Sequence, residues 1–296
     1  MPIDPNAVVY CEFGVALLAA SDTHYHVPIT PGVKAALLDM LKVTLNALGN
    51  STDWEPFDCA DQHASTACLQ CSTNDPIAVK LKNLYMAQNV STAAAALDNP
   101  SNIDYYFARF RDNYGNECVA VHKASVFKAA IGKNFMVWLV DQLTIVEKDL
   151  FRLDTDFDFL VFSDQIAIYR PIQFERIADL ESELIKIAPS HIQTVAATVT
   201  DLDFGFANEL VKTSSRARKL FASLKARNDL SGLSSDRIMH TCQANGIDII
   251  QKDGKWTPAP KHELAFLEML DRRRYNDPLV EVQPSAYRAA ARKKVV

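Results

Sequence analysis

The middle of the chain carries a series of short segments rich in aromatic and β-branched residues, and this series constrains the fold more than any other feature. Such segments have the composition of β-strands. Only Ser163, Asp164 and Gln165 separate two of them, whereas a parallel crossover needs a dozen or more residues. Neighbouring strands should therefore pair antiparallel in one central sheet. The predicted strands cover residues 103–111, 117–123, 135–141, 157–162 and 166–169.

Helical periodicity dominates on both sides of these segments. Val33, Leu37, Leu41 and Leu45 recur at helical spacing, and Gly49 follows where a C-terminal cap would lie. Helices are predicted over residues 31–48, 76–97, 174–187, 209–227, 235–244 and 261–274, with a long loop over residues 50–76. A strand over residues 247–251 precedes Asp253-Gly254, a pair that favours a type I′ hairpin turn. The pattern predicts an α+β fold with a central antiparallel sheet and a mainly helical C-terminal region.

Composition favours a globular protein of the cytosol. Of its 296 residues, 48% are hydrophobic, yet the longest apolar runs, residues 15–20 and 135–140, are far shorter than a membrane span. The first basic residue is Lys34, so no positive region precedes the apolar N-terminal stretch as it would in a secretory signal. Six cysteines in such a chain indicate reduced thiols and a cytoplasmic location. We expect two regions, a helical one with a cysteine-bearing loop over residues 1–100 and an α+β domain over residues 101–296.

Charge is distributed unevenly along the chain. The net charge is −5, but residues 1–150 hold 10 basic and 16 acidic side chains, whereas residues 151–296 hold 21 and 20. Residues 211–228 contain six basic side chains and no acidic one. On a helical wheel four of them share one sector and two flank the apolar sector, an arrangement that suits a row of phosphates, although a solvated helix face is the alternative. The predicted nucleic-acid-binding residues are Lys212, Arg216, Arg218, Lys219, Lys225 and Arg227.

The elements after this basic segment are ordered as in a winged helix-turn-helix module: a helix, a short link, a second helix and a tight hairpin. In that hypothesis the second helix would offer Arg237, His240 and Gln243 to a DNA groove. The order alone also fits many other α+β folds. Further cations, for which a solvated tail is the alternative, are Arg272, Arg273, Arg274, Arg288, Arg292, Lys293 and Lys294.

Two groups of residues have the composition of a metal site. Cys59, His63, Cys68 and Cys71 could close a tetrahedral zinc site. Their middle spacing is short and no glycine-containing knuckle surrounds them, so unliganded thiols are the preferred interpretation. His24 and His26 could share a strand face, but only the isolated Asp22 lies nearby as a third ligand. We therefore predict no metal and no other cofactor.

Asp154, Asp156 and Asp158 alternate in sequence and could project from one face of a strand as in a metal-dependent nuclease. The Glu and Lys that such a site needs on an adjacent strand do not follow. A solvated turn before the strand is the simpler interpretation, because turns favour Asp. The common phosphate-loop, dinucleotide-binding, zinc-protease and nucleophile-elbow motifs are missing from the sequence. No catalytic residue is predicted.

Two segments resemble a known family. They are DFDFLVFSDQIAIYRPIQFERI, with the pattern strand, tight turn, strand and helix, and FLEMLDRRRYNDPLVEVQPSAYRAAARKKV near the end of the chain. Both are similar to the KwaB family, the cytoplasmic component of the bacterial Kiwa anti-phage defence system. The resemblance extends over residues 100–296, and the residues before it resemble nothing identifiable.

The resemblance implies an effector that binds DNA, works with a membrane-embedded Kiwa partner protein and impedes phage DNA replication or expression. It supplies no active site at the level of residues. We also expect a homo-oligomer. The alternatives are a metal-dependent nuclease that uses Asp158 and its neighbours, and a structural adaptor that holds other proteins together.

Overall fold

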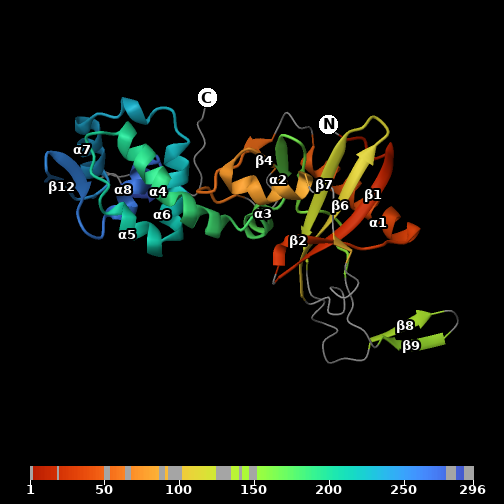
Figure 1. Cartoon of the computed structure of the whole chain (residues 1–296). Helices are drawn as coiled ribbons and strands as arrows, with labels where there is room; N and C mark the ends of the chain where they lie inside the picture. Colours follow the sequence, from red (N-terminus) through yellow and green to blue (C-terminus); the bar gives the residue numbers. More distant parts are fainter. Residues whose placement is uncertain are drawn as a thin grey trace. The chain divides into compact units, whose positions relative to one another are not determined.

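The computed structural model describes residues 3–18, 20–49, 54–63, 68–86, 91–92, 102–124, 135–139, 142–146, 152–277 and 285–289 (Figure 1). The chain divides into two compact units, and the first combines Met1–Phe57 with Ser65–Asp179. The second combines Asp58–Ala64 with Leu180–Val296. These units have different bounds from the regions 1–100 and 101–296 predicted from the sequence. Arg292, Lys293 and Lys294 lie outside the described residues.

Unit 1 is built on a nine-stranded sheet with the order β3-β4-β11-β10-β7-β6-β1-β2-β5. Every pairing from β4 to β2 is antiparallel, and only the outermost pairs β3–β4 and β2–β5 are parallel. The predicted central antiparallel sheet is therefore confirmed. Its strands are β1 (Val8–Leu17), β2 (Ala20–His26), β3 (Glu55–Pro56), β4 (Leu69–Ser72), β5 (Ser91–Thr92), β6 (Ile103–Asp112), β7 (Glu117–Lys123), β10 (Phe159–Val161) and β11 (Gln165–Ile168).

The N-terminal residues contribute more strands than the sequence pattern indicated. β1 lies between β6 and β2 inside the sheet, although its side chains do not alternate simply between buried and exposed. A search for strands by alternating apolar and polar residues does not find this strand, because its residues do not alternate. A separate hairpin pairs β8 (Phe135–Leu139) with β9 (Gln142–Val146). The rest of the predicted strand, residues 140 and 141, lies outside the described residues.

Helix α1 (Pro31–Leu48) forms as predicted and covers the core of unit 1. The Thr30 side chain caps it by accepting a hydrogen bond from the Val33 amide, and Pro31 occupies its first turn. It ends at Gly49, whose φ of 65° is a conformation that glycine adopts without strain. Its buried side chains pack into one core with those of β6 and β7, among them Leu37, Leu41, Leu45, Tyr106, Phe110 and Ala120. The 3-10 turn η2 (Pro76–Ala78) and helix α2 (Val79–Met86) follow β4.

Gly14 sits in β1 where there is no room for a side chain. A Cβ atom there would lie 2.3 Å from Cζ of the buried Phe107 ring on the paired strand β6. We expect Gly14→Ala to lower the free energy of unfolding by about 1–3 kcal/mol through overpacking. Gly32→Ala is the matched control, because its nearest neighbour would be Thr30 Oγ1 at 3.9 Å in the first turn of α1. Urea unfolding followed by circular dichroism measures both variants, and equal stabilities would contradict the prediction.

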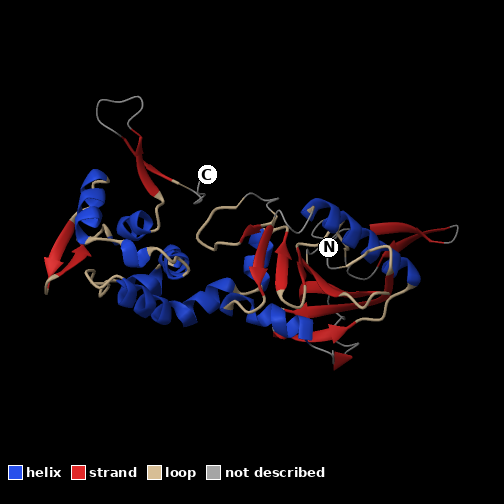
Figure 2. Cartoon of the chain, turned by 90° about the horizontal axis from the view of Figure 1, so that it is seen from above, coloured by secondary structure: helices blue, strands red, loops and turns tan. Residues whose placement is uncertain are grey.

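Unit 2 is mainly helical, which confirms the helical C-terminal region, and Figure 2 shows the contrast with the strands of unit 1. Its core gathers the apolar faces of α4, α6, α7 and α8, including Leu220, Phe221, Leu224, Phe266 and Leu267. Its elements are α4 (Leu180–Thr198), α5 (Ala207–Thr213), α6 (Ser215–Lys225), η6 (Leu230–Gly232), α7 (Ser235–Ala244), β12 (Ile249–Lys252), β13 (Lys255–Pro258), α8 (Glu263–Leu270), β14 (Arg274–Asp277) and β15 (Ser285–Arg288).

Two predicted helices are divided in the structure. The helix predicted over residues 209–227 is wrong, because Ser214 is extended between α5 and α6 and its side chain accepts a hydrogen bond from the Ala217 amide. This N-cap stabilises a helix start inside what looked like one periodic segment. The helix predicted over residues 174–187 is interrupted at Asp179, whose φ is 53°, between α3 (Pro171–Ile177) and α4. None of the described helices combines the length and the apolar character that crossing a bilayer requires.

Candidate nucleic-acid interface

The three arginines among the six predicted phosphate-binding cations make buried contacts inside unit 2. The Arg218 side chain is nearly buried and donates to the Val211 carbonyl and to the Glu181 carboxylate. Arg227 is equally buried, lies 2.8 Å from Asp229 and donates to the Leu270 carbonyl. Arg216 donates to the Ala60 carbonyl, and its Nε atom lies 3.6 Å from the Glu268 carboxylate. These arginines hold α6 against the rest of unit 2.

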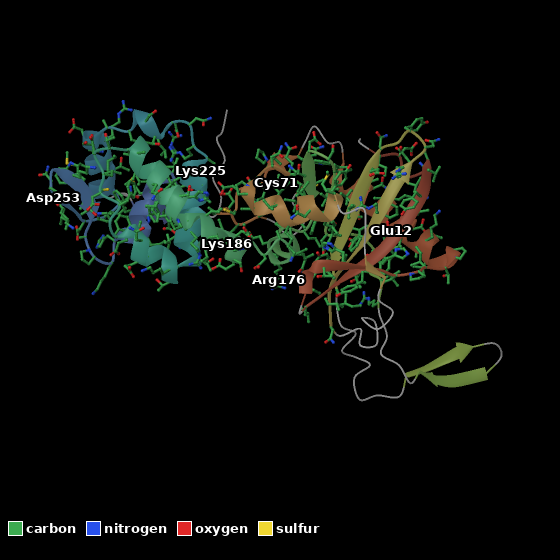
Figure 3. The ribbon with its side chains drawn as sticks, in the orientation of Figure 1. Glu12, Cys71, Arg176, Lys186, Lys225 and Asp253 are labelled. Carbon is green, nitrogen blue, oxygen red and sulfur yellow. The ribbon has the colours of Figure 1, made fainter. Side chains whose placement is uncertain are left out.

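The three lysines of the predicted set have different surroundings. Lys212 lies in α5 and forms an ion pair with Glu209, but both side chains are largely exposed, so the pair stabilises little. Lys219 is partly buried on α6. Lys225 is exposed at the end of α6 (Figure 3), and no described carboxylate pairs with it. The predicted single row of cations is therefore divided between two helices, and its binding to DNA stays a prediction.

Helix α7 presents a polar outer face, as the winged-helix hypothesis expected. Ile238 and Cys242 are buried in the core of unit 2. Arg237, His240 and Gln243 are exposed on the opposite side of the helix. The structure also contains the predicted order of elements: α6, the short turn η6, α7 and the hairpin β12–β13.

The hairpin adds two exposed cations beside a tight turn. Lys252 pairs in register with Lys255, and both side chains are exposed. The residues between them, Asp253 (labelled in Figure 3) and Gly254, have φ of 50° and 78°. Two positive φ values are what the predicted type I′ turn requires. In the described part of the chain, no carboxylate forms an ion pair with Arg237, Lys252 or Lys255.

One loop anchors both α7 and the hairpin. At the start of α7 the Ser235 hydroxyl donates to the Asp201 carboxylate at 2.6 Å. In the hairpin, the Trp256 amide donates to the Asp201 carbonyl at 2.9 Å. The Trp256 carbonyl in turn accepts from the Asp203 amide at 2.8 Å. The exposed cations of α7 and β12–β13 therefore belong to elements with a common support.

The residues of the possible zinc site are engaged elsewhere. Cys59 and His63 fall in unit 2, whereas Cys68 and Cys71 fall in unit 1. The His63 ring lies 2.8 Å from the Asp58 carbonyl, and Cys68 donates to the Ala47 carbonyl. Burial raises the pKa of the Cys71 thiol to about 12, which opposes the thiolate that zinc binds. Among the described residues no group of three or more suitable side chains could hold a metal ion.

The two candidate histidines near the N-terminus have separate partners. His24 Nε2 lies 2.8 Å from the Tyr105 hydroxyl, and His26 Nδ1 lies 3.1 Å from the Glu12 carboxylate. Each ring therefore has its own hydrogen-bonding partner in unit 1. The third ligand considered for them, Asp22, has no described side chain.

Three aspartates precede β10 rather than lying along it, and basic side chains lie close to all of them. Asp154 lies 2.8 Å from His122 and 2.9 Å from Arg152. Asp156 lies 2.6 Å from Arg170. Asp158 accepts from the Lys123 amide at 2.6 Å and lies 3.5 Å from His122 Nδ1.

Each of the three aspartates is engaged by a basic side chain or a backbone amide in this network. Burial raises the pKa of Asp158, and the nearby charges of His122 and Arg170 act against that effect. His122 and Arg170 were missed in the sequence because they lie on β7 and after β11, and only the sheet brings these segments together. The nuclease hypothesis therefore finds no metal-holding group in the described part of the chain.

A second network was missed entirely from the sequence. Arg273 is fully buried and contacts Asp58, Asp61 and Asp271. Asp58 and Asp61 lie more than 200 residues earlier in the chain. No local spacing rule could have paired them.

Comparison with known proteins places the chain in a family. No curated protein and no solved structure matches it. The family described as "Kiwa protein KwaB-like" matches residues 100–279, more than half of the chain. The match extends over β6, β7, β10 and β11 of unit 1 and over α4 to α8 of unit 2. The chain therefore belongs to the KwaB-like family of Kiwa proteins.

Proposed function

We propose that this protein is a non-catalytic DNA-binding effector of Kiwa anti-phage defence, and that it contacts DNA through the outer face of α7 and the hairpin β12–β13. Family membership implies a component of Kiwa defence that works with the KwaA component. We infer in addition that the partner is membrane-embedded and that the effector self-associates.

The observation that carries the DNA proposal is a set of exposed cations with no carboxylate partner among the described residues. Arg237 lies on α7, and Lys252 and Lys255 lie on the hairpin. Each cation that meets a phosphate releases condensed counterions from the duplex, and this release supplies much of the binding free energy. The acidic character of the chain as a whole does not oppose this, because local charge decides polyanion contact.

The six cations predicted from the sequence take different roles in this proposal. Lys212 and Lys225 extend the phosphate contact, because their side chains are exposed. Lys219, which is partly buried on α6, is a further candidate for this contact. Arg216, Arg218 and Arg227 hold α6 in place through their contacts with carbonyls and carboxylates. Replacing these arginines would therefore disturb the fold as well as any binding.

We expect the triple variant Arg237→Gln, Lys252→Gln, Lys255→Gln to bind a 20-base-pair duplex at least tenfold more weakly at low salt. The slope of log affinity against log salt should fall by about 0.9 for each phosphate that the variant no longer neutralises. Fluorescence anisotropy at several salt concentrations measures both quantities. The matched control, Lys42→Gln, Lys82→Gln, Lys186→Gln, removes the same charge elsewhere and should change affinity much less.

Plasmid incubated with the wild-type protein and Mg²⁺ or Mn²⁺ should stay intact. Cleavage would favour the nuclease instead. Loss of affinity that is equal in the triple variant and its control would place the DNA contact elsewhere. Absence of binding even at low salt would favour the adaptor hypothesis.

A further inference from the structure

A short acidic segment of the N-terminal half forms part of unit 2. We call residues 58–63, the described part of Asp58–Ala64, the acidic strap. It is turned on itself, since Asp58 accepts from the Ala60 amide with its side chain and from the Asp61 amide with its carbonyl. Ala60 is buried in the core of unit 2, and the Cys59 thiol lies 3.8 Å from the Lys219 carbonyl of α6. The strap therefore lies directly on α6.

The strap contacts Arg216 and Arg273. These two belong to a group of arginines that we call the arginine pocket: Arg216, Arg273, Arg274 and Arg288. The pocket contains the two buried carboxylates of Glu268 and Asp271. Glu268 lies 3.6 Å from Arg216, 3.3 Å from Arg274 and 3.4 Å from Arg288. Asp271 lies 2.6 Å from Arg273 Nε.

Among the ion pairs of the described residues, the strap supplies the charge that balances the pocket. Four guanidinium groups face two buried carboxylates, which leaves two positive charges. Asp58 and Asp61 supply two negative charges by pairing with Arg273. Ser223 adds a neutral contact, because its Oγ atom lies 2.8 Å from Asp58 and 3.1 Å from Asp271 and its one proton can be donated to either carboxylate. The strap therefore occupies the place of a doubly charged anion.

Phosphate groups have the chemistry to take the same place. A guanidinium group donates two parallel hydrogen bonds to a carboxylate or to a phosphate with nearly the same geometry. Arg216 Nε is buried and faces the buried Glu268 Oε1 atom at 3.6 Å, a distance too long for a good hydrogen bond. The side chains of Arg274 and Arg288 are 27% and 53% exposed, so these two members of the group are partly accessible.

We propose that the arginine pocket is an anion site for the phosphate groups of a nucleic acid, and that the acidic strap is its intramolecular occupant. Seating of the strap and binding of phosphate to the pocket then exclude each other. This inference rests on the proposed DNA binding and adds a regulated second contact, on the side of α6 that carries Arg216. Displacement of the strap would enlarge the DNA-binding surface of unit 2.

The test uses the full chain with Asp58→Asn and Asp61→Asn, which remove the strap's charge and keep its shape. We expect the affinity for a 20-base-pair duplex to rise about tenfold, and the salt slope to steepen by up to about 1.8, because two further phosphates are neutralised. Asp39→Asn, Asp164→Asn is the matched control, since it removes two exposed carboxylates of unit 1. The control should leave affinity within about twofold.

A second variant tests the same proposal with a smaller change, in case the double variant does not fold. Ser223→Ala removes the hydroxyl that contacts Asp58 and Asp271 and leaves both carboxylates in place. It should raise affinity severalfold while the circular dichroism spectrum stays unchanged. A synthetic peptide of residues 54–68 should compete with the duplex for the Asp58→Asn, Asp61→Asn protein.

The outcomes separate this inference from the proposed function. If wild-type protein binds the duplex and neither strap variant binds more tightly, the pocket is not a masked anion site and the strap is purely structural. If no protein binds the duplex, both proposals fail. If only the strap variants bind, the pocket is the principal contact and the surface of α7 and the hairpin is not.

Inorganic pyrophosphate should raise the melting temperature of the strap variants more than that of the wild type, and equal shifts would count against the pocket.

Discussion

Arg273→Met should lower the free energy of unfolding of unit 2 by about 3–5 kcal/mol, the cost of removing one partner from a buried ion-pair network. The Arg273 side chain is fully buried and contacts three carboxylates. Methionine fills much of the same volume, so the loss of stability would come chiefly from removal of the positive charge. Burial alone would lower the pKa of this guanidinium, but Asp271 and Asp61 raise it, which keeps the group charged. Without it Asp58, Asp61 and the buried Asp271 would repel one another.

The neighbouring residue provides the control for this prediction. Arg272 is largely exposed and pairs with the half-exposed Asp229. Because exposed pairs contribute at most about 1 kcal/mol, Arg272→Met should change stability by no more than that. Urea unfolding of both variants, followed by circular dichroism, makes the comparison. A loss in Arg273→Met as small as the one expected for Arg272→Met would mean that Arg273 is dispensable for unit 2.

The same network shows why the family match does not define a folding unit. Residues 100–279 include Arg273 and Asp271 but exclude Asp58 and Asp61, which complete the charge balance. Ala60, also outside the match, is part of the core of unit 2. A fragment that begins at residue 100 would therefore leave Arg273 without two of its three carboxylate partners.

Local sequence signals were sufficient to predict those elements whose structure is determined by their own residues. The helix at Pro31–Leu48 has an apolar stripe, a capping threonine and a terminal glycine, and all three are readable in the sequence. The turn at Asp253-Gly254 likewise follows from two residues that accept positive φ. The antiparallel pairing of β10 with β11 follows from the short link between them.

Prediction failed where distant contacts decide the outcome. A helical wheel over residues 209–227 placed Arg216, Arg218 and Arg227 on accessible sides of one helix. In the structure Ser214 breaks that helix. The carbonyl or carboxylate partners of these arginines include Ala60 and Glu181, which no local pattern could identify. A run of cations shows that charge is present, but not whether the fold pairs it internally.

Asp158→Ala should lower the free energy of unfolding of unit 1 by about 3 kcal/mol. The substitution removes the acceptor of the Lys123 amide, which lies 2.6 Å away, and a carboxylate beside His122 and Arg170. A buried amide without an acceptor costs about 1–3 kcal/mol, and the cavity and the broken ion pairs add to that. Thermal or urea unfolding at pH 7 measures the change. Asp164→Ala, at an exposed position, is the control and should be nearly neutral.

Asp158→Asn separates the hydrogen bond from the charge. Its amide oxygen can still accept from Lys123, so we expect a loss within about 1 kcal/mol at pH 7. Because burial raises the pKa of Asp158 in the folded state, the folded protein binds this proton more readily than the unfolded chain does. The stability that Asp158 contributes is therefore fully present below its unfolded pKa and declines as pH rises through the folded pKa. Measured against Asp158→Asn, wild-type stability should fall over that interval. A rise would show that ion pairing with His122 and Arg170 outweighs the cost of burying the charge.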